Sequence, residues 1–149
     1  MGIFKEDLLS FGRLLDREIE VRLLPEEFRR LFPDFEVQLT GNLMRIRGRR
    51  RGFFRRGFEF RAGGENRVYR TQEGDVGVYL RVIDPSGLEE LLRTEGVSLE
   101  GESLKLSLLK VLEGNELYGR VPEELRRRLQ PLRYSIGEGY LSLFLRVSR

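Results

Sequence analysis

Three segments of this sequence carry the same order of local signals. Each has a short run of β-favouring residues, then a proline at position 25, 85 or 122, and soon afterwards two adjacent glutamates. Proline fits the first turn of a helix because it lacks the N–H group that would have no partner there. Acidic side chains are stabilised at the same, positive end of a helix. We therefore expect short helices near 25–32, 85–95 and 122–130.

Each expected helix is followed by two alternating apolar segments that flank a tight turn. The turns are LTGNL, LEGES and IGEGY, in which glycine and asparagine supply the positive φ angles that two-residue hairpins require. These signals predict three hairpins. A period of two places the following side chains on their inward faces: Val37, Leu39, Met44 and Ile46; Val97, Leu99, Leu104, Leu106 and Leu108; Tyr134, Ile136, Leu141, Leu143 and Leu145.

The repeated order predicts an α+β fold made of three β-α-β-β units that form a curved, mostly antiparallel sheet. The units span about 19–47, 78–109 and 117–147. Further strands, about 54–62 and 67–70, should lie between the first two units and be joined by the turn AGGEN. Apolar residues at helical spacing from Phe4 to Leu15 predict an N-terminal amphipathic helix. Because no linker divides the chain, we expect residues 1–149 to form a single domain.

The charge of the chain is concentrated in one segment, residues 45–61. This segment holds eight arginines and one acid, Glu59, so its formal charge is +7. The whole chain carries +3, which leaves −4 for all the other residues. Four phenylalanines share the segment with the arginines. We expect a basic hairpin, inserted after the first unit, whose phenylalanines at 58 and 60 face the core while Phe53 stands at the apex.

Catalytic chemistry finds little support in the composition. The chain has no cysteine and no histidine, which removes thiolate chemistry, the commonest general base and the commonest transition-metal ligand. The paired glutamates are explained by their positions at helix starts. Glu73 and Asp75 flank a glycine in QEGDVG and are interpreted as turn residues rather than metal ligands. We expect no enzymatic activity, no catalytic residues, no metal site and no cofactor.

The segments that combine a helix with a hairpin resemble the repeats of a known protein family. The strand, the helix with an acidic start and the following GVSLEGESLKLSLL resemble the repeats of LmeA-like relatives of the tubular lipid-binding (TULIP-like) bacterial proteins. The closing LQPLRYSIGEGYLSLFLRV is similar to the final hairpin of that family, and the likeness extends from about Ile19 to Val147. The resemblance implies a curved antiparallel sheet wrapped on helices, with lipid as the ligand.

Three interpretations of the basic hairpin are open at this point. An anionic or amphiphilic lipid surface, the first expectation, would attract the arginines and take up an exposed ring. Nucleic acid, and RNA in particular, would offer phosphates to the arginines and an unpaired base to Phe53. Alternatively, the hairpin is structural and its charge is only solvated. The predicted ligand-binding residues are Arg47, Arg49, Arg50, Arg51, Phe53, Arg55 and Arg56.

The expected location follows from the apolar segments. No run of residues is long and apolar enough for a transmembrane helix. The first residues, MGIFKEDLLSFGRLLDRE, lack the basic and uninterrupted apolar regions of a signal peptide. We therefore expect a cytoplasmic protein, a location compatible with peripheral association with a membrane. The sequence leaves the oligomeric state open.

Overall fold

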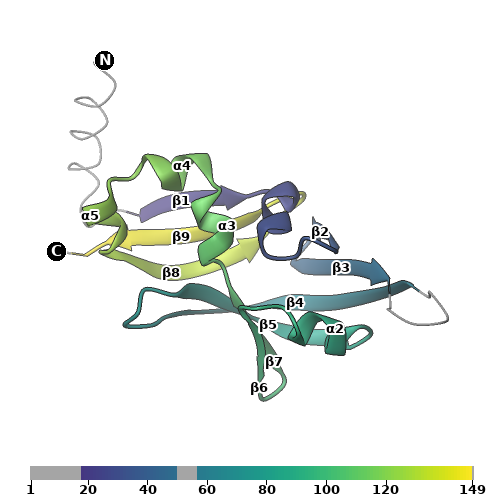
Figure 1. Cartoon of the computed structure of the whole chain (residues 1–149). Coiled ribbons are helices and arrows are strands. Elements are labelled where there is room, and N and C mark those ends of the chain that lie inside the picture. The colour runs from purple at the N-terminus through teal and green to yellow at the C-terminus, as the bar shows by residue number, and fades with distance from the viewer. Residues whose placement is uncertain (1–17, 50–56, 149) are drawn as a thin grey trace.

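The computed structural model describes residues 18–49 and 57–148 of the chain. These residues form two antiparallel sheets, one of three strands in the order β1-β9-β8 and one of six in the order β2-β3-β4-β5-β7-β6. In Figure 1 the three-stranded sheet lies beside α3, α4 and α5, and the six-stranded sheet lies below it.

The elements follow one another along the chain with short connections. In order, they are β1 (Glu18–Leu23), η1 (Pro25–Arg30), β2 (Glu36–Thr40), β3 (Leu43–Arg49), β4 (Gly57–Arg70), β5 (Val76–Asp84), α2 (Leu88–Leu92), β6 (Val97–Glu100), β7 (Ser103–Ser107), α3 (Leu109–Glu113), α4 (Glu116–Arg120), α5 (Glu123–Arg126), β8 (Leu129–Ile136) and β9 (Leu141–Val147).

The predicted fold class is wrong, because the structure is mostly β. Strands make up 52% and helices 20% of the described residues, and each of these helices has only four to six residues. Helices this short gain their stability from tertiary packing rather than from their own hydrogen bonds. They therefore act as covers and connections for two sheets and do not form a layer of their own. The predicted amphipathic helix between Phe4 and Leu15 lies outside the described residues.

The three predicted hairpins exist as β2–β3, β6–β7 and β8–β9. The paired glutamates also occupy the first turns of η1, α2 and α5, as expected. The three units are nevertheless not equivalent. The first opens with β1, which pairs with β9 rather than with its own hairpin, and the third opens with the helix α4 where a strand was predicted. The equivalence fails because strand partners are chosen by distant segments, which a local pattern does not record.

A second correction concerns the predicted turn AGGEN. The chain does not turn there, since β4 runs without interruption from Gly57 to Arg70 and pairs with β3 and then with β5. The register to β5 shifts between Gly64 and Arg67, and Asn66 has a φ of 53°. The segment is therefore a β-bulge. Bulges and turns both favour glycine and asparagine, which explains why the two were confused.

One apolar cluster lies between the sheets. It includes inward residues of both sheets and residues of η1 and α3. The side chains predicted to face inward are buried, with the exception of Leu99, which is 42% exposed. Leu99 lies on β6, the last strand of the six-stranded sheet. Its exposure shows that alternation along this edge strand does not produce a buried face.

Candidate functional site

The two arms of the predicted basic hairpin are β3 and the first half of β4. Their antiparallel register places Arg45 opposite Arg61, Arg47 opposite Glu59 and Arg49 opposite Gly57. The predicted pairing of these arms is therefore confirmed. We refer to β3 together with residues 57–63 of β4 as the basic ribbon.

The inner face of the basic ribbon is anchored in the core. Met44, Ile46 and Phe60 have no exposed surface, and Phe58 is 5% exposed. The ring of Phe58 lies against Gly87 so closely that a Cβ at this glycine would fall 1.9 Å from Phe58 Cδ2. This packing fixes the position of the ribbon and leaves its arginines on the opposite, outer face.

Only part of the predicted binding site falls within the described residues. Arg47 is exposed, and its Nε lies 3.2 Å from Oε1 of Glu59. Both side chains are partly open to solvent, and exposed pairs of this kind contribute only about 0–1 kcal/mol. An external anion can therefore compete with Glu59 for Arg47. Arg49 ends β3, while the predicted site residues Arg50, Arg51, Phe53, Arg55 and Arg56 lie outside the described residues.

The outer face of the six-stranded sheet carries a row of polar residues across four strands. Gln38 on β2 is opposite Arg45, Arg45 is opposite Arg61, and Arg61 is opposite Asp84 on β5. Nη2 of Arg61 lies 3.3 Å from Oδ2 of Asp84. The pKa of Asp84 is below its usual range, mainly because the backbone N–H of Ser86 donates to it and in addition because of Arg61. The row therefore has one acidic end and two adjacent arginines at its centre.

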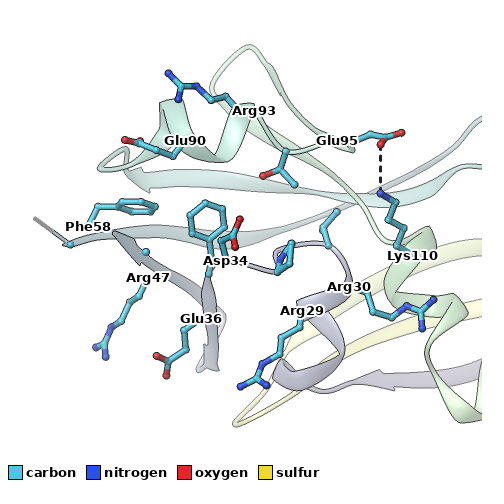
Figure 2. Close-up of a pocket in the computed structure, with 16 residues that line it drawn as sticks. Arg29, Arg30, Asp34, Glu36, Arg47, Phe58, Glu90, Arg93, Glu95 and Lys110 are labelled. Carbon is cyan, nitrogen blue, oxygen red and sulfur yellow. Dashed lines mark ion pairs between the residues drawn. The ribbon is translucent and has the colours of Figure 1, made fainter. Parts of the chain in front are cut away.

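An open groove of about 1230 Å³ adjoins one end of the basic ribbon. Gly48, Gly57 and Phe58 of the ribbon contribute to it, as do residues of η1, β2, α2 and α3 and of the segment before β2. Figure 2 shows Arg47 and Glu36 on one side of the groove, and on another Glu90 of α2 and Arg93, which directly follows α2. The groove thus brings together residues that lie far apart in the sequence.

Cations and carboxylates share the lining of the groove. Lys110 pairs with Glu95 at 3.6 Å, as the dashed line in Figure 2 marks. Arg29, Arg30 and Arg93 are exposed, and in the described part of the chain none of them has a carboxylate within 4.0 Å. These three arginines can accordingly interact with an external anion without first releasing a carboxylate of the described residues.

Phe35 supplies an aromatic surface to this groove. Its ring is half-buried and contacts Phe58 at 5.6 Å and Phe32 at 6.0 Å between ring centroids. A Cβ at Gly48 would lie 2.4 Å from the Phe35 ring, so the glycine at this position allows the ring to lie directly on β3. Phe35 is thereby held in place while one part of it lines the groove.

The sequence reasoning missed Arg29, Arg30, Arg93 and Phe35. Arg29, Arg30 and Arg93 fell within the helices expected near 25–32 and 85–95, to which no binding role was given. Phe35 fell between the first of these helices and the hairpin that follows it. One available signal was the dense segment FRRLFPDF, which mixes basic and aromatic residues as the basic hairpin does.

The acidic side chains of the described residues were compared with the requirements of a metal site. Within ranges 18–49 and 57–148, no three His, Cys, Asp or Glu side chains are grouped to hold a metal ion. Asp75, considered above as a turn residue, accepts hydrogen bonds from Tyr69 Oη at 3.1 Å and from Ser107 Oγ at 2.5 Å. Its oxygens therefore have structural partners.

A search of the described helices found none with the length and apolar character needed to cross a membrane. Comparison of the chain with family models, curated proteins and solved structures found no match. The geometry of the basic ribbon and the groove is consequently the basis for any functional assignment.

Proposed function

We propose that this protein is a non-enzymatic binding protein whose ligand is single-stranded nucleic acid, RNA in the first instance. The ligand would lie along the outer face of the basic ribbon and enter the adjoining groove. The main support for the proposal is that the basic ribbon and the groove form one continuous surface. Arg47 belongs to the ribbon and also lines the groove, together with Arg29, Arg30 and Arg93.

An extended polyanion fits this surface because its charges recur along its length. The basic ribbon presents Arg45, Arg47 and Arg61 on one face, and the sequence continues it with the arginines of segment 49–56. Each arginine that neutralises a phosphate releases a condensed counterion, which makes such binding strong at low salt and weak at high salt. Arginine is also suited to phosphate because its planar fork can donate two parallel hydrogen bonds.

Single-stranded nucleic acid is favoured over lipid by the character of the groove. Its lining mixes charged side chains with the ring of Phe35, and base stacking on aromatic rings is the usual complement to phosphate contacts in single-strand recognition. An acyl chain would require an enclosed apolar cavity, whereas this groove is open and charged. Among the described residues, the exposed large apolar side chains Leu24, Leu92, Leu99 and Leu117 lie outside both the ribbon and the groove, and only Ile83 of β5 lies beside the ribbon, near Gly63. A membrane-binding tip would need several such side chains beside the arginines.

The proposal is tested by titrating a labelled single-stranded RNA with wild-type protein and with a variant that carries Arg29→Gln, Arg47→Gln and Arg93→Gln. We expect the variant to bind more weakly and to show a smaller slope of log K against log salt concentration, by about 0.7 per lost phosphate contact. The control variant carries Arg120→Gln, Arg127→Gln and Arg146→Gln, three exposed arginines outside the ribbon and the groove.

The two variants have the same net charge, so a general electrostatic attraction would weaken both equally. Equal losses would therefore contradict the proposal. Vesicles of phosphatidylglycerol are titrated in parallel. Binding to vesicles but not to RNA, with the loss confined to the first variant, would replace nucleic acid by an anionic membrane surface as the ligand.

A further inference from the structure

Arg45 and Arg61 form an unusual pair in the outer row of the six-stranded sheet. They lie directly opposite each other on β3 and β4. Side chains in such positions have Cβ atoms about 4.5–5.5 Å apart, and like charges placed this way destabilise a sheet. A fold that needed only solvated charge at this face would be more stable with one of these arginines replaced by a neutral residue.

Three other basic side chains of this sheet are occupied by partners within the protein. Arg47 contacts Glu59, and Arg67 lies over the ring of Tyr79 at 3.9 Å. Lys105 lies over the ring of Tyr69 at 4.6 Å. Arg45 differs from them, because no described side chain or carbonyl accepts a hydrogen bond from it.

The Nε atoms of Arg45 and Arg61 also lack a partner within the described residues. Nε of Arg45 and Nε of Arg61 are buried, and neither finds an acceptor among the described residues. Arg61 donates a hydrogen bond to Asp84 only through its Nη2. Buried donors without partners are uncommon in folded proteins and indicate a missing acceptor. Two such donors, on two adjacent like charges, indicate an acceptor that is also an anion.

We infer that Arg45 and Arg61, with Gln38 beside them, form a binding site for a single phosphate group. The charge of the phosphate would offset the repulsion between the guanidinium groups, and its oxygens would accept from both Nε–H groups once the two side chains turn outward and uncover them. Asp84 limits the site to one group, because it already occupies the far end of the row. The inference rests on the proposed function in that it names the group that the basic ribbon recognises, and it can be tested without nucleic acid.

The first measurement is the melting temperature in inorganic phosphate, compared with chloride at equal ionic strength. We expect wild type to gain about 2–4 °C when phosphate exceeds its dissociation constant about fivefold. Arg45→Gln should melt higher than wild type in chloride, since the like-charge pair is gone, and should gain nothing from phosphate. Arg120→Gln, which removes one distant surface charge, should retain the gain.

A second measurement follows phosphate binding in the wild-type protein itself. The Nε–H signals of ¹⁵N-labelled wild type are followed by NMR during a phosphate titration, and assigned by comparison with Arg45→Gln and Arg61→Gln. We expect the signals of Arg45 and Arg61 to move together and to saturate with one dissociation constant. A gain in melting temperature that persists in Arg45→Gln, or Nε–H signals that do not move, would overturn the inference.

The same protein samples separate this inference from the proposed function. If Arg45→Gln loses phosphate binding while wild type fails to bind RNA, the phosphate site stands and nucleic acid is not the ligand. Phosphatidylglycerol vesicles then show whether a lipid headgroup supplies the phosphate. If wild type binds RNA and Arg45→Gln binds it equally well, the ribbon binds RNA through other arginines and the phosphate site is wrong.

Discussion

The side-chain hydroxyl of Tyr134 on β8 donates a hydrogen bond to the backbone carbonyl of Tyr79 on β5. The same oxygen accepts the backbone N–H of Glu65 at 3.0 Å. Glu65 belongs to the bulge of β4, where the register to β5 shifts and the ladder between the two strands is interrupted. One side chain from the three-stranded sheet therefore completes the hydrogen bonding of two strands of the six-stranded sheet.

Tyr134→Phe should destabilise the protein by about 1–3 kcal/mol, because it leaves a backbone donor and a backbone acceptor without their partner while it keeps the buried ring. Urea denaturation measures the loss. The matched control is Tyr140→Phe, which removes a hydroxyl that bonds to no described residue and should change stability little. Equal effects of the two substitutions would show that the Tyr134 hydroxyl does not contribute to stability.

The same hydroxyl predicts how stability depends on alkaline pH. Burial raises the pKa of Tyr134 from 10.0 to about 12. Since the folded state favours the protonated phenol, its contribution is fully present below about pH 10 and is lost as the pH rises through about 12. The unfolding free energy of wild type should therefore fall more steeply between these values than that of Tyr134→Phe. Parallel curves for the two proteins would contradict the assignment.

The contact between Gly87 and Phe58 predicts a further effect. Gly87 has a φ of 77°, and a Cβ there would overlap the ring of Phe58. Gly101 has a similar φ of 63° but no atom near its Cβ position. We expect Gly101→Ala to destabilise the protein by about 1–2 kcal/mol through backbone strain alone. Gly87→Ala should cost about 1–3 kcal/mol more because the core is also overpacked.

Urea midpoints of the two alanine variants provide this comparison. If both lose the same amount, the ring of Phe58 moves aside without cost and does not anchor the basic ribbon. If Gly87→Ala alone also weakens RNA binding, the position of Phe58 sets the geometry of the groove.

The parts of the fold that could be predicted from sequence are those that local chemistry determines. The turn LTGNL became a hairpin turn because Gly41 and Asn42 both have positive φ, at 27° and 61°. The division into two sheets could not be predicted in this way. It depends on the pairing of β1 with β9. Ile19 of β1 and Leu145 of β9 are opposite each other although they come from opposite ends of the chain. Alternation shows which side of a strand is apolar, but it does not show which strand lies beside it.

The candidate site was predictable to the same extent. The concentration of arginines located the basic ribbon, since charge density is a property of the sequence itself. The groove depends on the approach of η1 and α2, and it could be found only from the structure. The opposed arginines, Arg45 and Arg61, required the register of β3 and β4. Alternation with a period of two shows which face of the sheet a residue is on, but it does not show which residue of the neighbouring strand lies opposite.

Phe35 provides the last prediction, because it distinguishes base stacking from charge attraction. Phe35→Leu removes the aromatic ring but keeps an apolar side chain against Phe32 and Phe58. Loss of one stacked base should weaken binding to single-stranded RNA by about 1–3 kcal/mol. Binding to duplex should change little, because its bases are already stacked on one another.

The control for this substitution is Phe144→Leu on β9, where a half-buried ring lies under Arg133 and outside the groove. It should leave RNA binding unchanged. Fluorescence titrations at two salt concentrations separate the contributions, because salt screens the arginines and has little effect on stacking. At the higher salt, the relative loss caused by Phe35→Leu should therefore persist. If Phe35→Leu binds single strands as well as wild type does at both salt concentrations, the ring serves only to pack β3, and the basic ribbon binds through charge alone.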